Sequence, residues 1–259
     1  TINYEAPVKE AKVVSVSAIN AAQLQIKFNK AVDKDTVVDA DGTLKNGVLT
    51  VTKVSGTGSV TVGDTSLATL SEDGKTLTVT AAAGAFNNIN FVVTTPKDTI
   101  KTTDGKYVAE YTSNVLVAND ATAPVVTNIE KRTASQVRVY FSEPLLNEGS
   151  WTFKFADGTS ANVTVDASNK AKGYVDLTIN AGIQAGKEIT ATVIGAKDYA
   201  GNLVNPNPFT VNFSKGQLDG VKPTVSSVTT NGLTTFEVKF SEEVQGLTAA
   251  DISIDGVAR

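Results

Sequence analysis

One short motif occurs three times in this chain, and its spacing constrains the fold more than any other feature of the sequence. The copies are residues 24–28, 137–141 and 236–240. In each copy apolar residues alternate with polar ones, as in a strand with one buried face. The last residues of the copies, all Phe, lie 113 and 99 positions apart. The chain is therefore predicted to be a tandem array of units about 100 residues long.

The junctions between the units carry a second repeated pattern. Asp120 is followed four residues later by Pro124, and Asp219 is followed in the same way by Pro223. Proline fixes φ and lacks an N–H, so it stiffens the entry to a first strand without joining the ladder. We expect one unit over residues 1–118, a second over 119–217 and an incomplete third over 218–259. A start at Thr1 without an initiator Met suggests a segment of a longer chain.

Within the second unit the pattern of apolar residues predicts seven short strands, with no long helix. Seven strands in about 100 residues is typical of an immunoglobulin-like β-sandwich, so the fold class is all-β with tandem Ig-like sandwiches. The expected strands cover residues 125–129, 137–141, 151–155, 163–165, 175–179, 189–193 and 209–213. The expected core comprises Val139, Phe141, Phe153, Val165, Leu177, Ile179, Ile189, Val193, Val211 and Phe213.

The first unit matches the second with an offset that changes along the chain. Val79, Ile89 and Asp98 each precede a counterpart by 100 residues, whereas Phe28 precedes its counterpart by 113. The first unit is therefore predicted to hold an insertion of about 13 residues between Phe28 and Val79. The Ala-rich run at residues 81–86 is short and interrupted by a glycine, which favours a connection over a helix.

Composition excludes several classes of function. The chain has no His, no Cys and no Met, which removes the usual general base, thiol nucleophiles, disulfides and the usual zinc ligands. Glu143, Glu148 and Asp157 are the acids that could hydrolyse a glycoside, but the one Trp, Trp151, alternates with two Phe and is expected in the core rather than in a cleft. We therefore predict no enzymatic activity.

Charge and hydropathy limit the partners. A net charge of −4 with mixed signs disfavours nucleic acid or an anionic membrane, and no apolar run is long enough to span a bilayer. Lys27, Arg138 and Lys239 occupy the outward phase of the repeated strand. A solvated face is the ordinary interpretation of such charges, and a lateral contact between subunits is the alternative.

Three features now coincide: an Asp with Pro four residues on, a strand that ends in Phe-Ser-Glu, and the run Lys-Asp-Tyr-Ala-Gly-Asn at 197–202. Together they resemble the Ig-like repeat of surface-layer proteins from Gram-positive bacilli. The resemblance implies an extracellular, cell-surface structural protein that self-associates into a two-dimensional lattice. The alternative is a spacer, or a module that binds cell-wall polysaccharide or another glycan, within a larger secreted protein.

The topology of the sandwich predicts a calcium site at the head of the second unit. Successive antiparallel strands bring the first strand's start and the loops after strands two, four and six to one pole, where Asp120, Glu143, Asp166 and Asp198 lie. Calcium takes six to eight oxygen ligands, often carboxylates from separate loops. The third unit should repeat the site with Asp219 and either Glu242 or Glu243. The first unit has Lys30 in place of Glu143 and Pro7 in place of Asp120, so we expect no calcium site in that unit.

Overall fold

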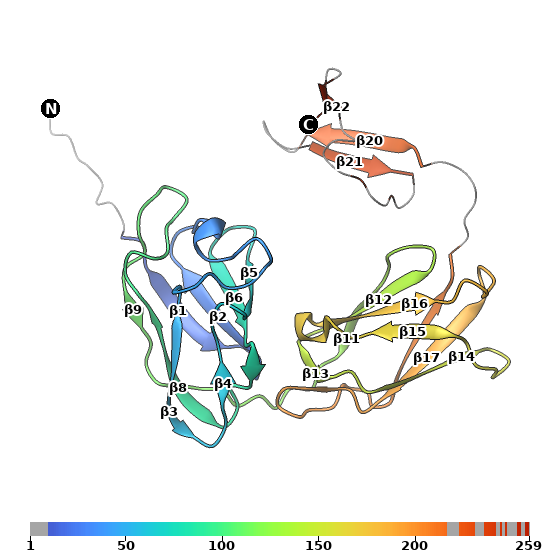
Figure 1. The fold of residues 1–259 in the computed structure, drawn as a ribbon, viewed down its shortest axis with the longest axis horizontal. Helices are drawn as coiled ribbons and strands as arrows, with labels where there is room; N and C mark the ends of the chain where they lie inside the picture. The colour runs from blue at the N-terminus through green and yellow to red at the C-terminus, as the bar shows by residue number, and fades with distance from the viewer. Residues whose placement is uncertain are drawn as a thin grey trace.

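The computed structural model is dominated by β-strands, with two short 3-10 helices (Figure 1). It describes residues 10–216, 223–230, 236–241, 244, 247, 253–254 and 257–258. Two β-sandwiches follow one another along the chain, drawn from blue to green and from green to orange, and a separate hairpin of strands β20 and β21 follows them. Within the described residues, no helix has the length and hydropathy needed to span a membrane.

The second unit confirms the predicted strands. Its elements are β11 (Val126–Lys131), β12 (Gln136–Phe141), β13 (Leu145–Asn147), β14 (Ser150–Phe155), β15 (Val163–Asp166), η2 (Lys170–Lys172), β16 (Tyr174–Ile179), β17 (Glu188–Ile194), β18 (Lys197–Asp198) and β19 (Phe209–Ser214). Seven of these strands form two antiparallel sheets in the orders β11-β12-β16-β15 and β14-β17-β19. This is the strand order of a seven-stranded immunoglobulin sandwich. The pairing of β13 with β18 was not predicted.

Alternation along β12 explains why this segment folds as a strand with one face buried. Val137, Val139 and Phe141 are buried between the sheets, while Arg138 and Tyr140 lie half-buried on the outer face. Most of the predicted core is fully buried, but Phe153 and Val165 are only partly buried against it. Trp151 is also partly buried rather than enclosed, because β14 is an edge strand of a three-stranded sheet.

The first unit has the same architecture with more irregular connections. Its elements are β1 (Val13–Ala18), β2 (Gln23–Phe28), η1 (Lys34–Thr36), β3 (Thr50–Gly56), β4 (Val60–Thr61), β5 (Leu67–Leu70), β6 (Thr76–Thr80), β7 (Ala83–Gly84), β8 (Ile89–Thr95), β9 (Tyr111–Thr112) and β10 (Leu116–Val117). The sheets have the orders β1-β2-β6-β5 and β10-β8-β3, with β9 also paired to β8 and β4 paired to β7. The Ala-rich run forms no helix and contributes β7.

The predicted insertion of about 13 residues in the first unit lies between β2 and β3. Val51 pairs with Val93 as Trp151 pairs with Val193, so the offset has already fallen to 100 at β3. The insertion lies along the free edge of β5, where the Ala68 N–H donates to the Gly42 carbonyl at 2.9 Å. Its side chains Val37, Val38 and Leu44 are buried and extend the core.

The outward charges of the repeated strand differ among the three units. Lys27 and Lys239 are exposed, as a solvated face requires. Arg138 instead makes a two-pronged ion pair with Asp176, with N–O distances of 2.7 and 2.9 Å, and lies 3.8 Å over the ring of Tyr174. The third copy of the motif forms β21 (Phe236–Phe240), which pairs with β20 (Val225–Thr230). Two further short strands, β22 (Ser253–Ile254) and β23 (Val257–Ala258), pair with each other.

Candidate metal centre

Three carboxylates meet at the head of the second unit. One oxygen each from Asp120, Glu143 and Asp198 lies within 4.8 Å of the others. Asp120 precedes β11, Glu143 follows β12, and Asp198 ends β18, which pairs with β13 at Leu145. The antiparallel order brings the start of β11 and the end of β12 to the same pole, and the β13–β18 pair brings Asp198 beside them.

Asp198 is the fixed point of the cluster. Its side chain is buried, with 1% of the residue exposed. One oxygen accepts hydrogen bonds from the backbone N–H groups of Ala200 and Asn202, both at 2.8 Å, and the other accepts from the Asn202 Nδ2 at 2.9 Å. Hydrogen bonds of this kind fix the direction of a buried carboxylate. The turn at 198–202 therefore holds the Asp198 side chain in one position at the pole.

Asp120 links the cluster to the first unit. One oxygen accepts from the backbone N–H of Thr122, at 3.0 Å, and the other accepts from the N–H of Ala21 in the turn between β1 and β2, also at 3.0 Å. The Asp120 N–H donates to the side-chain oxygen of Asn87 at 3.3 Å. Asp120 thus makes hydrogen bonds to two loops of the first sandwich and lies within 4.8 Å of two acids of the second.

The pKa of Glu143 is shifted by its surroundings. Its pKa is raised to about 7, chiefly by partial burial and then by the negative charges of Asp120 and Asp198 and a hydrogen bond with Asp120. A carboxyl group is stabilised in its neutral form when it faces like charges. A bound cation would have the opposite effect and hold all three groups ionised.

The donor set fits a hard divalent cation. Three carboxylates from separate segments provide oxygen ligands of the kind that calcium prefers, and backbone carbonyls and water commonly complete such a shell. Soft metals that require thiolate or imidazole find no ligand in a chain without Cys or His. Calcium remains a prediction at this point.

The other acids that the sequence singled out do not join the cluster. Asp166 accepts a hydrogen bond from the Ser168 N–H at 2.9 Å and closes its own turn, because its carboxylate lies on the exposed face of β15. Glu148 forms an ion pair with Lys170 at 3.3 Å, and Asp157 caps the Thr159 N–H at 2.9 Å. Asp219 and Glu242 lie outside the residues that the structure describes.

Asn202 is the functional residue that the sequence argument missed. Besides Asp198, its amide nitrogen donates to the backbone carbonyls of Asp120 and Thr122, at 3.4 and 3.2 Å. It therefore joins the turn that holds Asp198 to the linker that holds Asp120. The signal was present in the run at 197–202, where this Asn ends the motif.

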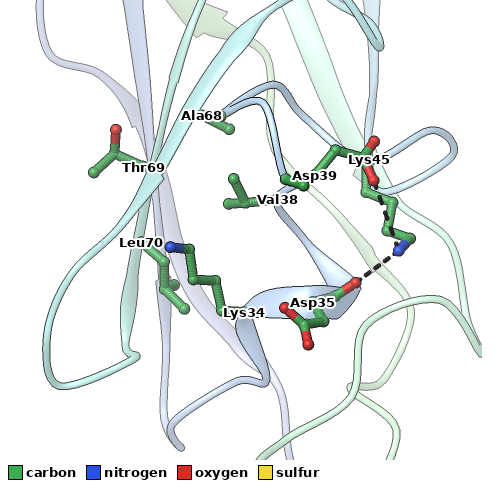
Figure 2. A pocket seen from close by; sticks show the side chains of 10 residues that line it. Lys34, Asp35, Val38, Asp39, Lys45, Ala68, Thr69 and Leu70 are labelled. Carbon is green, nitrogen blue, oxygen red and sulfur yellow. Dashed lines mark hydrogen bonds and ion pairs between the residues drawn. The ribbon is translucent and has the colours of Figure 1, made fainter. Parts of the chain in front are cut away.

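A second feature of the surface is a hollow of about 530 Å³ beside β5. Figure 2 shows that the insertion contributes Lys34, Asp35, Asp39 and Lys45 to it, opposite Thr69 and Leu70 of β5. Lys45 donates to the Asp35 carbonyl at 2.8 Å and lies 3.7 Å from the Asp39 carboxylate. Lys45 and Asp39 thus balance each other's charge on this rim.

The class of fold is also found by comparison with known domains. Residues 115–215, which contain the carboxylate cluster, match the model of a family described as a bacterial Ig-like domain. The fold class predicted from the repeated strand is therefore confirmed, both by the strand order and by this match.

Longer relatives give the setting of this domain. The outer cell wall protein of Brevibacillus brevis is 31% identical over 247 residues, covering 93% of this chain and 21% of that protein. The surface-layer 125 kDa protein of Lysinibacillus sphaericus is 31% identical over 237 residues, covering 90% of this chain and 18% of that protein. The chain thus spans about a fifth of the length of these relatives.

Solved structures include the S-layer protein rSbsC(31-844). It aligns with 93% of this chain and 34% of its own at 19% identity, with a TM-score of 0.41. The resemblance to the Ig-like region of surface-layer proteins is confirmed by the named relatives. Their names also agree with the predicted extracellular, cell-surface location.

Proposed function

We propose that this chain is a structural part of a surface layer, an extracellular lattice built by self-association of one protein on the cell wall. The observation that carries the proposal is the similarity of nearly the whole chain to two proteins named for the outer cell wall and the surface layer. A row of rigid sandwiches suits this role, because a lattice needs spacers of fixed length.

The proposal includes calcium at the head of the second unit. Asp120, Glu143 and Asp198 supply the oxygen ligands, and Asn202 holds Asp120 and Asp198 in place. Asp120 also contacts Ala21 of the first unit, so an ion bound here would hold the joint between the two sandwiches at one angle. A lattice requires that angle to be constant.

We further propose that the chain has no catalytic role. The three clustered acids are not joined by a nucleophile or base of the usual kinds, since the chain lacks His and Cys. The acids that resemble a glycosidase pair, Glu148 and Asp157, are each used in a local contact. A hydrolase turnover that Glu143→Gln abolishes would contradict this view.

Electron microscopy of the protein tests the lattice proposal. With millimolar calcium we expect sheets or tubes, which a chelator should disperse. The Asp198→Asn variant, which keeps the shape of the side chain but removes its charge, should assemble poorly. If the protein stays monomeric with calcium and instead binds isolated cell-wall polysaccharide, the alternative of a glycan-binding module or spacer is favoured.

A further inference from the structure

The pole of the first unit is the structural counterpart of the metal cluster, although its residues differ. The side-chain oxygen of Asn29 accepts a hydrogen bond from the Lys12 N–H, and the Asn29 N–H donates to the Lys12 carbonyl. In the second unit, the Ser142 hydroxyl accepts from the Val125 N–H, and the Ser142 N–H donates to the Val125 carbonyl. The residue after Asn29 is Lys30, and the residue after Ser142 is Glu143. Lys30 therefore occupies the position of Glu143.

In the loop opposite Lys30, backbone pairing shows that the alignment with an offset of 100 residues does not hold. Val32 pairs with Thr102 as Leu145 pairs with Asp198, and Lys101 pairs with Tyr107 as Lys197 pairs with Leu203. Thr102, rather than Asp98, is thus the counterpart of Asp198. Both positions are buried, with 2% and 1% of the residue exposed.

Equivalent turns follow these two positions. The Thr102 N–H donates to the Lys106 carbonyl at 2.8 Å, as the Asp198 N–H does to the Asn202 carbonyl at 3.1 Å. The Lys106 N–H donates to the Thr102 hydroxyl, where the Asn202 N–H donates to the Asp198 carboxylate. The counterpart of Ala200 in this turn is Asp104.

Charge is balanced inside the first unit. The Lys30 Nζ lies 3.5 Å from a carboxylate oxygen of Asp104, and the Thr102 hydroxyl donates to the other oxygen. The Thr102 hydrogen bond, and then the charge of Lys30, hold the pKa of Asp104 below its usual range. At this pole the ammonium of Lys30 thus faces a carboxylate, where the second unit brings three carboxylates together.

We propose that Lys30 is the residue that determines cation specificity at this pole, and that its ammonium takes the place of the metal ion. The first sandwich then closes its pole without any divalent ion, while the second requires one. The claim that the second unit requires a divalent ion rests on the proposed function above. The claim that the Lys30 ammonium takes the place of an ion in the first unit does not.

Amide spectra of the whole isotope-labelled chain, titrated with calcium chloride, compare the two poles directly. The N–H signals of Ala200 and Asn202 should shift, and those of their counterparts Asp104 and Lys106 should not. A shift at Lys106 with the same midpoint as at Asn202 would overturn the inference. If no signal shifts at either pole, the calcium proposal fails and the next measurement decides the role of Lys30.

That measurement is amide exchange in the variants Lys30→Met and Lys30→Arg. Loss of an exposed ion pair typically changes an opening equilibrium by roughly 1.4- to 5-fold. Lys30→Met should speed exchange at Gly105 and Lys106 by a factor in this range, and Arg should restore the wild-type rate. Unchanged exchange in the Met variant, or no recovery with Arg, would show that the charge has no such role.

Transfer of the charged residues of the first pole into the second unit provides a stricter test. The triple variant Glu143→Lys, Asp198→Thr, Ala200→Asp gives the second unit the pole of the first. In chelator it should melt above Asp198→Thr alone, and its melting temperature should not respond to calcium. The inference fails if the triple variant melts no higher than the single variant.

Discussion

At the scale of the residue, Glu143 gives the second unit a dependence on pH. Its folded pKa of about 7 lies above the ordinary value of 4.5, so between these values the folded state binds more protons than the unfolded state. Without divalent cations, the contribution of Glu143 to stability should therefore be fully present below pH 4.5 and be lost as the pH rises through 7. We expect a loss of roughly 1 to 2 kcal/mol, allowing for solvent screening of a half-exposed group.

Urea unfolding followed by the fluorescence of Trp151, which lies in this unit, measures that loss. Glu143→Gln serves as the control, because an amide does not titrate and the curve should flatten. Saturating calcium should also flatten the curve for the wild type. A stability that rises between pH 5 and 7 in chelator would contradict the assigned direction of the pKa.

Phe141 is the residue on which the inward phase of the repeated strand depends. It is 6% exposed and its ring lies edge-on to Phe209, with centroids 5.9 Å apart. Truncation to Ala removes a large buried ring and should lower the free energy of unfolding by about 3 to 5 kcal/mol. Ile194→Ala, at a position 56% exposed, should cost about 0.5 kcal/mol or less. A loss below about 1 kcal/mol for Phe141→Ala would mean that the phase is wrong.

At the scale of the element, the connection from β13 to β14 depends on one glycine. Gly149 has φ of +75°, and a Cβ there would lie 2.5 Å from the Ala196 nitrogen and 2.6 Å from the Ile194 oxygen. Backbone cannot yield as a flexible side chain does, so Gly149→Ala should cost about 2 to 4 kcal/mol from strain and overpacking together. The matched control is Gly158→Ala, where φ is +81° but no atom lies within 4 Å.

In the control only the left-handed backbone is strained, and about 1 to 2 kcal/mol is expected. Thermal unfolding with Trp151 as the reporter compares the two variants under one set of conditions. Equal losses for Gly149→Ala and Gly158→Ala would show that the close approach of the backbone at 194–196 is not a constraint.

Long alternating strands were predictable from the sequence, whereas short strands and side-chain directions were not. The strands of the second unit were predictable because Val137, Val139 and Phe141 alternate with polar residues, and the three acids because antiparallel order assigns each loop to a pole. The pairing of β13 with β18 was not predictable, since two or three residues carry no periodicity. Asp166 was assigned to the cluster wrongly, because topology locates a loop but not the direction of its side chain.

The place of the insertion was also beyond a count of residues. The change of offset put it between Phe28 and Val79, but only the pairing of Val51 with Val93 placed it before β3. In the same way, counting by 100 set Asp98 opposite Asp198, whereas the bridge from Val32 identifies Thr102. Loops that change length shift an alignment locally, and hydrogen-bond pairing is needed to restore it.

At the scale of the whole molecule, the chain is an array of sandwiches, and charged side chains gather at the joint between the first two. The linker residue Asp120 is held by Ala21 and Asn87 of the first sandwich and by Asn202 of the second. Asp120, Glu143 and Asp198 lie in one cluster, and like charges this close repel one another unless a cation is bound. A divalent ion would therefore stabilise the second sandwich and its attachment to the first at the same time.

Trp151 fluorescence reports the melting temperature of the second unit in the whole chain, and comparing this temperature in calcium and in chelator decides whether an ion stabilises the joint. Binding to the folded state alone adds about 2.7 kcal/mol of stability when the ion is at 100 times its dissociation constant. We predict a clear rise with millimolar calcium in the wild type and none in Asp198→Ala. An unchanged melting temperature in the wild type, or an equal rise in the variant, would contradict the account.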